Sequence, residues 1–263
     1  MNEYAGVPTR ETAPQAKAYA ERAIAIDDQL GEPHAALGSV NEQLWQWERA
    51  EREYKRAIQL SPNYATAYHW YSIFLKGLGR FDEAALMIKR AQEIDPLSSV
   101  ISINLSRMYQ LQNDHNASIE NTRKLIELDP NFALAYDYLG LSYLKQGRNG
   151  EAIASLEKAV AMSNRASVAL MDLGYAYAVT GKRAEATAIA KELEEMYAKK
   201  ETSGRNVAAV YAGLGEKDKA FEWLEKDFQT RDDLLVIKWQ IPYESLHDDP
   251  RYKDLRKKMN LPE

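Results

Sequence analysis

Small residues recur along this chain at intervals of 34 residues, and this spacing constrains the fold more than any other feature of the sequence. The recurring position is alanine or serine in successive units: Ala50, Ala84, Ser118, Ala152, Ala186 and Ala220. In the same frame glycine recurs at 79, 147, 181 and 215, and Asn113 stands at this position in the third unit. A fixed period of this length indicates an array of repeated structural units.

Each unit contains two runs of helical periodicity that are joined by a turn. In ALAYDYLGLSYLKQGRNGEAIASLEKAVAM, the first run places Tyr136 and Tyr143 on one face, and the second places Ala152 and Leu156 on another. Gly147 follows the first run, where a residue in the left-handed conformation commonly ends a helix. Proline follows the second run in several units, where the helix does not continue. Each unit is therefore predicted to be a helix-turn-helix.

This pattern of aromatic, Leu-Gly, Tyr, Ala and Pro positions resembles the tetratricopeptide repeat over residues 14–230. The resemblance implies an all-α fold, a right-handed superhelical α-solenoid of helix-turn-helix repeats with a C-terminal capping segment. We assign the solenoid to residues 14–234 and the cap to residues 235–263. The solenoid is divided into a lone helix and six repeats: 14–29, 31–64, 65–98, 99–132, 133–166, 167–200 and 201–234.

Both ends of the array lead to expectations. The lone helix matches the second helix of a unit, yet Gly6 and Pro8 precede it, so we expect the chain to be a fragment of a longer array. Solenoids need a cap over the apolar side of the final repeat. Five apolar residues are expected to supply that cover: Leu234, Leu235, Ile237, Trp239 and Ile241. Asp249 and Pro250 then suit an N-cap and a first helical position, which predicts a last helix to about Met259.

A second resemblance concerns the C-terminal part of the chain. The sequence YAGLGEKDKAFEWLEK and the tail RDDLLVIKWQIPYESLHDDPRYKDLRKKMNLPE are similar to the C-terminal repeat module of bacterial multidomain signalling proteins. In that family the module follows a winged-helix regulator, a serine/threonine kinase or a cyclase domain. The resemblance implies a regulatory context in a larger protein and no activity of this chain itself.

Composition excludes several classes of function. The net charge of -5 comes from 34 basic and 39 acidic residues that are interspersed, which disfavours direct binding of nucleic acid. The chain contains no cysteine, so disulfides and thiolate metal sites are excluded. It has neither an obvious export signal nor an apolar run of about 18 residues. We therefore expect a cytoplasmic protein without membrane contact.

The sequence offers little material for catalysis. It has four histidines, but no pair has the i, i+4 spacing of a zinc-binding helix, so no metal is expected. The segments GLGRFD and GLGEKD join two helices and lack the third glycine of a dinucleotide fingerprint, so they are interpreted as turns. We predict no catalytic residue, no cofactor and no enzymatic activity.

In tetratricopeptide arrays the first helices line a concave groove. At about 100° per residue, the second, fifth, sixth, ninth and thirteenth places of a first helix share one side. An apolar and aromatic surface with isolated polar groups is typical of a groove that binds a peptide or helix. We predict a partner-binding groove from the following residues: His69, Trp70, Ile73, Ile103, Asn104, Arg107, Asp137, Tyr138, Leu141, Met171 and Tyr175.

The segment ATAYHWYS shows how this frame separates two faces of one helix. Tyr68 and Tyr71 occupy the fourth and seventh places, so they are expected to pack on the second helix of the same unit. His69 and Trp70 are turned from Tyr68 by about 100° and 200°, toward the groove.

Several positions also suit a purely structural role. One group more often belongs to the core between repeats: Val100, Ile103, Leu134 and Val168. A second group suits both roles about equally, because large amphipathic rings pack well at seams and at interfaces: Trp70, Tyr138 and Tyr175. Arg107 and Asp137 can form a salt bridge between units, worth under about 1 kcal/mol.

The predicted function is a non-enzymatic protein-protein interaction scaffold. It would hold a peptide, a helix or a protein segment in the groove, including a segment of another domain of its own parent protein. Two alternatives stay open: a small-ligand sensor that controls an absent effector domain, and a self-assembly module. A groove that closes into a pocket of a few hundred Å³ would favour the sensor.

Overall fold

The computed structural model describes residues 9–44, 46–230, 237 and 240–258. These residues form an all-α fold, and no strand occurs among them. The chain divides into two compact units, unit 1 (Met1–Ile101) and unit 2 (Ser102–Glu263). Within the described part of the chain, none of the helices has the length and apolar composition needed to cross a membrane.

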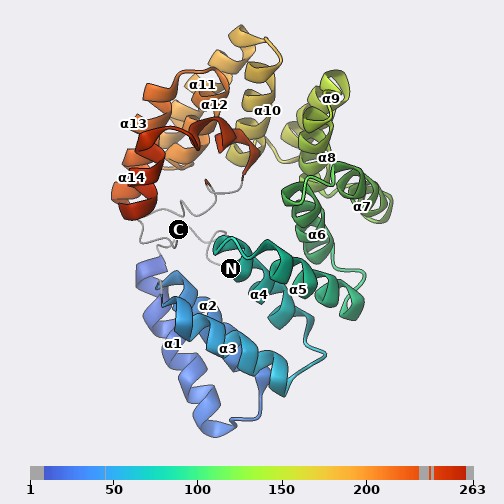
Figure 1. Cartoon of the computed structure of the whole chain (residues 1–263), viewed down its shortest axis with the longest axis vertical. Helices are drawn as coiled ribbons and strands as arrows, with labels where there is room; N and C mark the ends of the chain where they lie inside the picture. The colour runs from blue at the N-terminus through green and yellow to red at the C-terminus, as the bar shows by residue number, and fades with distance from the viewer. Residues whose placement is uncertain (1–8, 45, 231–236, 238–239, 259–263) are drawn as a thin grey trace. The chain divides into compact units, whose positions relative to one another are not determined.

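Unit 1 consists of hairpin-like helix pairs (Figure 1). Its helices are α1 (Thr9–Ile26), α2 (Gly31–Gln43), α3 (Trp47–Leu60), α4 (Ala65–Gly77) and α5 (Phe81–Ile94). Helix α2 packs on α3, α4 packs on α5, and α1 packs on α2. Helix α1 begins five residues before the predicted lone helix, and Pro14 lies inside it. A proline removes one main-chain hydrogen bond but does not prevent a turn before it, which is why the sequence pattern missed this start.

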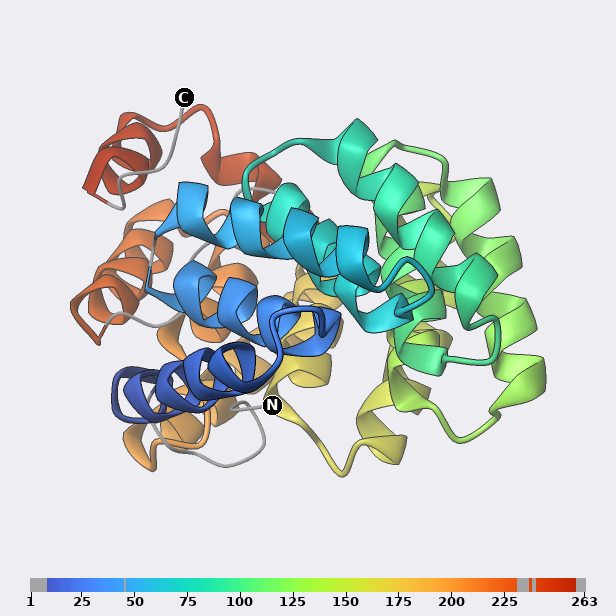
Figure 2. The ribbon, with the colours of Figure 1, turned by 90° about the horizontal axis from the view of Figure 1, so that it is seen from below.

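Unit 2 continues the same arrangement (Figure 1 and Figure 2). Its helices are α6 (Ser99–Leu111), which begins in unit 1, then α7 (His115–Leu128), α8 (Ala133–Lys145), α9 (Asn149–Met162), α10 (Ser167–Val179), α11 (Arg183–Ala198), α12 (Gly204–Gly213), α13 (Lys217–Thr230), η3 (Ile241–Leu246) and α14 (Pro250–Lys258). Pairs form between α8 and α9, α10 and α11, and α12 and α13. Helix α10 also contacts α8 and α12, so the first helices of successive pairs form one layer.

The recurring small residues lie where the two helices of a pair meet. All of them have no exposed surface: Ala50, Ala84, Ser118, Ala152, Ala186 and Ala220. Their small side chains let the helices approach closely. Gly140 shows how little space is left, because a Cβ atom there would lie 2.6 Å from Leu156 Cγ. The small residues thus set the close packing within each pair.

The turns inside the pairs use left-handed residues, as the sequence predicts. Gly147 has a φ of 71°, and Asn113 has a φ of 57° at the equivalent position. The residue after each one closes the helix end. Arg148 N donates to the carbonyl of Tyr143 at 2.9 Å, the hydrogen bond of a Schellman motif.

The sixth predicted repeat begins later than its frame. Its first helix, α12, starts at Gly204 instead of residue 201. The carboxylate of Asp227, a fully buried residue of α13, accepts hydrogen bonds from Gly204 N at 2.5 Å and Arg205 N at 2.6 Å. An acidic group at a helix N-terminus satisfies amides that have no partner within the helix. A tertiary contact therefore sets this start.

The C-terminal segment covers the end of unit 2. Of the residues expected to form the cap, Ile237 and Ile241 are buried, whereas Leu234, Leu235 and Trp239 lie outside the described residues, as do Gly6, Pro8 and Met259. Helix α14 begins at Pro250, directly after Asp249, as the sequence predicts. It is tied to α13 by two ion pairs: Arg251 with Asp218 at 2.8 Å, and Lys258 with Glu225 at 3.0 Å.

Candidate functional site: the first-helix face

The predicted groove residues divide between the two units. His69, Trp70 and Ile73 belong to α4 in unit 1, and the others belong to α6, α8 and α10 in unit 2. We call the side of α6, α8, α10 and α12 that carries these residues the first-helix face of unit 2. The residues that define it are Ile103, Asn104, Arg107, Asp137, Tyr138, Leu141, Met171 and Tyr175.

In unit 1, the predicted groove residues of α4 are partly or fully buried. Trp70 is half-buried and packs against a cluster of Ala35, Ala57 and Ala67, contributed by α2, α3 and α4. His69 is buried, and this burial, together with the charge of Lys76, lowers its pKa to about 4, so its ring is neutral at pH 7. Trp70 therefore contributes both to packing and to the remaining surface.

Tyr68 and Tyr71 are buried, as the helical frame predicts. Tyr71 reaches α3 of the preceding pair, where its ring stacks on Tyr54 with centroids 5.7 Å apart. Phe74 also stacks on Tyr71 at 6.1 Å and contacts Tyr54 at 5.6 Å, so the three rings form one cluster. The Tyr71 hydroxyl donates to Glu51 Oε1 at 3.0 Å. These aromatic residues join the two helix pairs of unit 1.

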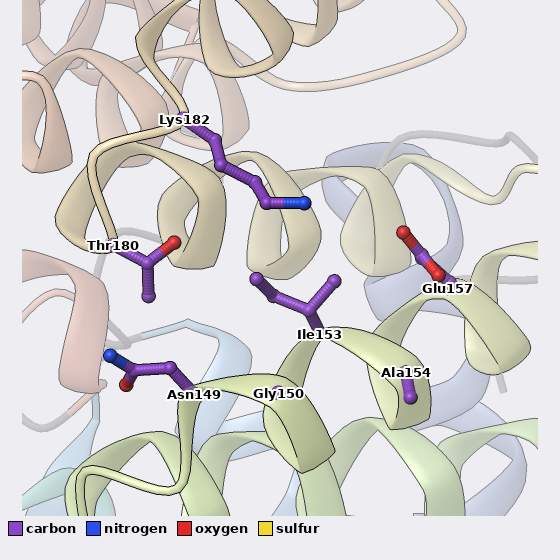
Figure 3. A pocket seen from close by; sticks show the side chains of 7 residues that line it. All are labelled: Asn149, Gly150, Ile153, Ala154, Glu157, Thr180 and Lys182. Atoms are coloured by element: carbon purple, nitrogen blue, oxygen red, sulfur yellow. The ribbon is translucent and has the colours of Figure 1, made fainter.

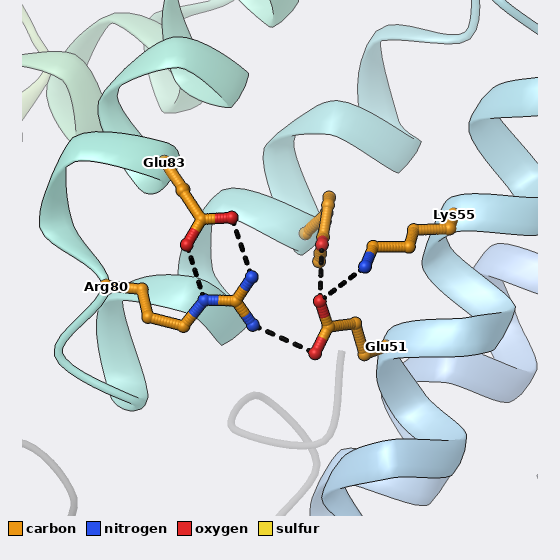
Figure 4. Close-up of polar contacts among 5 residues, drawn as sticks. Glu51, Lys55, Arg80 and Glu83 are labelled. Carbon is orange, nitrogen blue, oxygen red and sulfur yellow. Dashed lines mark hydrogen bonds and ion pairs between the residues drawn. The ribbon is translucent and has the colours of Figure 1, made fainter.

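Glu51 is the centre of a polar cluster that also joins these pairs (Figure 4). Its carboxylate accepts from Lys55 at 2.8 Å and from Arg80 at 2.9 Å, and Arg80 also pairs with Glu83 at 2.6 Å. Burial alone would raise the pKa of Glu51, but the hydrogen bonds from Arg80, Lys55 and Tyr71 lower it to about 2. Glu51 is therefore ionised throughout the neutral range.

In unit 2 the first helices bury several residues that were predicted to line an open groove. Ile103 and Tyr138 form a hydrophobic cluster with Leu125 and Ala135. Tyr138 is only 5% exposed, and the guanidinium carbon of Arg107 lies 4.9 Å from the centre of its ring. Neighbouring first helices thus approach closely enough to cover the fifth and sixth places of the frame.

The other predicted residues of this face vary in exposure. Leu141 and Met171 are buried, whereas Asn104, Arg107 and Tyr175 are half-buried. Fewer of the predicted groove residues are therefore accessible than the sequence led us to expect. Whether these residues contact a partner stays a prediction.

Apolar residues at the second place of the first helices behave in the opposite way. Val100, Leu134 and Val168 are exposed by 52%, 43% and 39%. Their expected role in the core between repeats is therefore wrong. Neighbouring first helices contact each other through later places, such as Ile103 and Tyr138, and the second place of these helices stays exposed.

A pair of buried carboxyl groups lies on the first-helix face of unit 2. Asp137 of α8 and Asp172 of α10 are 2% and 4% exposed, and each carboxyl group affects the pKa of the other. Burial raises the pKa of both groups, and the charge of Asp137 raises that of Asp172 further. Arg107 is the cation whose charge acts on both carboxyls. The pair therefore keeps a proton at a pH where an exposed aspartate is ionised.

Two oxygen atoms of this pair have no hydrogen-bond partner among the described residues, namely Oδ1 of Asp137 and Oδ1 of Asp172. A buried carboxyl oxygen without a partner is energetically unfavourable. The pair is therefore a place where the packing of α8 against α10 is sensitive to protonation.

The C-terminal segment also reaches this face, which the sequence interpretation did not predict. We call η3 (Ile241–Leu246) the strap. Tyr243 is fully buried, its hydroxyl donates to the carbonyl of Arg205 at 3.0 Å, and it lies 3.7 Å from Met171 Sδ. Glu244 Oε2 accepts from Lys145 Nζ at 2.7 Å. The strap therefore connects α8, α10 and α12.

A sequence signal for the strap exists but is ambiguous. Ile241, Tyr243 and Leu246 are apolar residues in a segment that follows the last repeat. Their pattern indicates burial but does not identify the surface that they cover.

A surface pocket of about 430 Å³ lies elsewhere in unit 2 (Figure 3). It is lined by Asn149, Gly150, Ile153, Ala154, Glu157, Thr180 and Lys182. None of the predicted groove residues lines it, and most of its lining residues are exposed. The pocket is therefore separate from the first-helix face. In the part of the chain that the structure describes, no three His, Cys, Asp or Glu residues are grouped as a metal site would require.

Comparison with known proteins identifies similar sequences. The family described as Tetratricopeptide repeat matches residues 36–99 and 112–201, more than half of the chain. The Drosophila melanogaster protein O-mannosyl-transferase Tmtc2 is 32% identical over 81 residues, which are 30% of this chain. The chain spans only 9% of the length of that relative.

Comparison with solved structures supports the same architecture. The APC/C hetero-tetramer Cut9-Hcn1 has a TM-score of 0.67 at 13% identity, covering 93% of this chain and 46% of that one. YrrB, described as a TPR protein with an unusual peptide-binding site, has a TM-score of 0.51 at 16% identity and covers 78% of this chain and 97% of that one. At these identities the likeness shows the fold alone.

Proposed function

Because the chain belongs to the tetratricopeptide repeat family, we propose that it is a non-enzymatic scaffold that binds a peptide, helix or protein segment on its first-helix face. The observation that carries this proposal is the exposure of Leu134 and Val168 at equivalent positions of α8 and α10. Large apolar side chains that packing leaves uncovered at successive repeats are typical of an interaction surface.

Half-buried polar and aromatic side chains support the same proposal. Asn104, Arg107 and Tyr175 lie on the same face and keep part of their surface exposed. An apolar surface of this kind supplies most of the binding energy, and a few polar groups orient the ligand. In addition, YrrB is described as having a peptide-binding site, and Cut9 is found in a hetero-tetramer with Hcn1.

We further propose that the chain is the regulatory part of a larger protein. This part of the proposal rests on the resemblance of the C-terminal residues to the repeat module of bacterial signalling proteins. In such a protein the scaffold would hold a partner, or a segment of another domain, close to the effector.

The scaffold function can be tested with a charge placed on the proposed surface. Leu134→Glu with Val168→Glu should lower affinity for a captured partner by at least about tenfold, because a buried apolar contact is replaced by a desolvated charge. The matched control is Leu128→Glu, which alters an apolar side chain of α7 that is 68% exposed. The measurement is affinity capture from a lysate of the source organism, followed by titration of each captured protein.

The control decides the interpretation. Equal capture by the first-helix variant and by the Leu128→Glu variant would contradict binding on this face. Circular dichroism of all proteins shows whether the substitutions alter folding.

A further inference from the structure

The strap occupies a subsite on the first-helix face of unit 2 that fits an aromatic side chain followed directly by a carboxylate. We propose that a partner segment with this chemistry binds at the same subsite by displacing the strap. This inference rests on the proposed function, because it names the chemistry of the partner and the way in which the chain regulates access to its own surface.

The aromatic part of the subsite is formed by α10 and α12. Tyr243 has no exposed surface, its hydroxyl donates to the carbonyl of Arg205 at 3.0 Å, and Met171 Sδ lies 3.7 Å from the hydroxyl oxygen. The main chain of Arg205 is held in turn by Asp227 of α13, whose carboxylate accepts a hydrogen bond from Arg205 N at 2.6 Å. The acceptor for the phenol is thus fixed in place by α13 and does not depend on the strap.

The acidic part of the subsite is formed at the end of α8. Lys145 Nζ lies 2.7 Å from Glu244 Oε2, and the side chain of Glu244 is 49% exposed. An ion pair with this exposure contributes little to stability, but it selects a carboxylate over other groups. In the strap the carboxylate belongs to the residue directly after the aromatic one, and we assign the same order to the partner segment.

The strap has the features of a replaceable occupant. It is a short 3-10 helix, a type of helix with poor hydrogen-bond geometry, and its contacts with α8 and α10 are made by side chains. A foreign segment with the same two side chains can make the same contacts. Because the strap is tethered, its effective concentration is on the order of millimolar, so a partner must compete with it.

The subsite also stabilises unit 2 when it is filled. Tyr243 and Leu246 belong to the main hydrophobic cluster of unit 2, together with residues of α10 and α12. Displacement therefore leaves a surface that the incoming segment must cover again. This requirement favours partners that carry an aromatic residue of similar size.

The proposal is tested by supplying the strap as a separate peptide. The probe is a synthetic peptide of residues 240–247, QIPYESLH, with blocked ends, and the receptor is the full chain with Tyr243→Ala and Glu244→Gln. By isothermal titration calorimetry, this variant should bind the peptide at least about tenfold more tightly than the unmodified chain does. The peptide should also raise the melting temperature of the variant, because it binds only the folded form.

Changes to the peptide and the receptor test each part of the subsite. A peptide with alanine in place of its tyrosine should bind the variant at least about tenfold more weakly. Adding Lys145→Glu to the receptor should weaken binding of the original peptide, and a peptide with lysine in place of its glutamate should restore it. If Lys145 had only a structural role, exchanging the charges of the receptor and the peptide would not restore the affinity.

The inference is overturned if the folded variant does not bind the peptide, or if the unmodified chain binds it equally well. If circular dichroism shows that the double variant is unfolded, the receptor is the single variant Tyr243→Phe, which keeps the ring and removes only the hydrogen bond to the carbonyl of Arg205. That variant should bind the peptide more tightly than the unmodified chain, and equal affinity would overturn the proposal. A third outcome separates the two proposals. If captured partners require Leu134 but the peptide does not bind, the scaffold function is retained and only the strap subsite is rejected.

Discussion

The two units use carboxyl groups in opposite ways. In unit 1, Glu51 remains ionised because three side chains donate hydrogen bonds to it, and its side chain is 22% exposed. In unit 2, Asp137 and Asp172 are almost completely buried, each raises or lowers the pKa of the other, and the charge of Arg107 acts on both. The comparison shows that the supply of donors and the access of water decide whether a carboxyl group in a helix array is charged or protonated.

Because of this difference, the carboxyl groups of the two units contribute to folding stability with opposite dependence on pH. The pKa of Glu51 is lowered in the folded state, so its contribution to stability is present above its unfolded pKa and is lost as the pH falls toward about 2. The pKa of Asp172 is raised in the folded state. Its contribution is therefore largest below its unfolded pKa and is lost as the pH rises through its folded pKa.

The largest expected effect concerns the aromatic residue that supports the cluster of unit 1. Tyr71→Ala should lower the free energy of unfolding by about 3–5 kcal/mol, because it removes a buried ring that packs on both Tyr54 and Phe74. Trp70→Ala should cost clearly less, since Trp70 is only half-buried. Urea unfolding followed by circular dichroism measures both losses.

Two results would change this view of unit 1. Equal losses for the two variants would mean that Trp70 is a packing residue and is not available to a partner. Tyr71→Phe is the control for the hydroxyl group, and it should cost only about 1 kcal/mol because it removes a single hydrogen bond.

The next effect concerns the buried pair of unit 2. The unmodified chain should lose up to about 1.4 kcal/mol of stability per pH unit as the pH rises from about 4 through the folded pKa of Asp172, because one proton is bound only in the folded state. Asp172→Asn should reduce this dependence, since its amide is neutral, whereas burial still raises the pKa of Asp137. Thermal melts between pH 4 and pH 8 measure the slope.

The matched control for the pair is Asp254→Asn, which changes an exposed aspartate of the same unit. It should leave the pH dependence of the melting temperature unchanged. An unaltered slope in the Asp172→Asn variant would show that the pair does not hold the proton that we assign to it.

A smaller effect with the opposite sign is expected in unit 1. Glu51→Gln should lower stability at pH 7 by about 1 kcal/mol, because the hydrogen bonds to a partly exposed carboxylate become weaker. The difference from the unmodified chain should narrow as the pH falls toward 2, where Glu51 itself takes up a proton. A difference that widens in acid, measured by urea unfolding between pH 3 and pH 7, would contradict this assignment.

The smallest effect concerns helix ends, where unit 2 has a position that can be improved. Lys200 follows α11 with a φ of 62°, whereas Gly147 follows α8 with a φ of 71°. Lys200→Gly should stabilise the chain by about 0.5–1 kcal/mol, because glycine adopts this conformation without strain. The reverse change, Gly147→Lys, should cost a similar amount, since a Cβ atom there meets nothing within 4 Å. Thermal melts that show no gain for Lys200→Gly would mean that other contacts of Lys200 offset the strain.

The helix pairs could be predicted from the sequence because each pair is encoded locally. The small residue at 152 and the glycine at 147 specify a seam and a turn within one repeat, and both features appear in the structure. The frame also placed Asp137 and Tyr138 on one side of α8, and in the structure both lie next to residues of neighbouring first helices. Their burial depends on how closely the next first helix approaches, and this distance is not encoded in the pattern of a single repeat.

The position of the strap could not be predicted for a different reason. Residues 241–246 have no counterpart in the repeats, so the period offers no register for them. Tyr243 carried a signal for burial, but its contacts with Met171 and Arg205 depend on tertiary structure. Leu134 and Val168 were misassigned because neighbouring first helices were expected to bury these places of the frame, whereas both side chains are exposed.

The strap also changes how unit 2 can unfold. A repeat array in which each unit touches only its neighbours loses structure stepwise from its ends, because its stability is a sum of local terms. The contact between the buried Tyr243 and Met171 joins residues that are 72 positions apart, and it places the strap in the hydrophobic cluster of the last helix pairs. These pairs are thereby coupled to one another, so the C-terminal end of the array melts as a cooperative block and does not fray one repeat at a time.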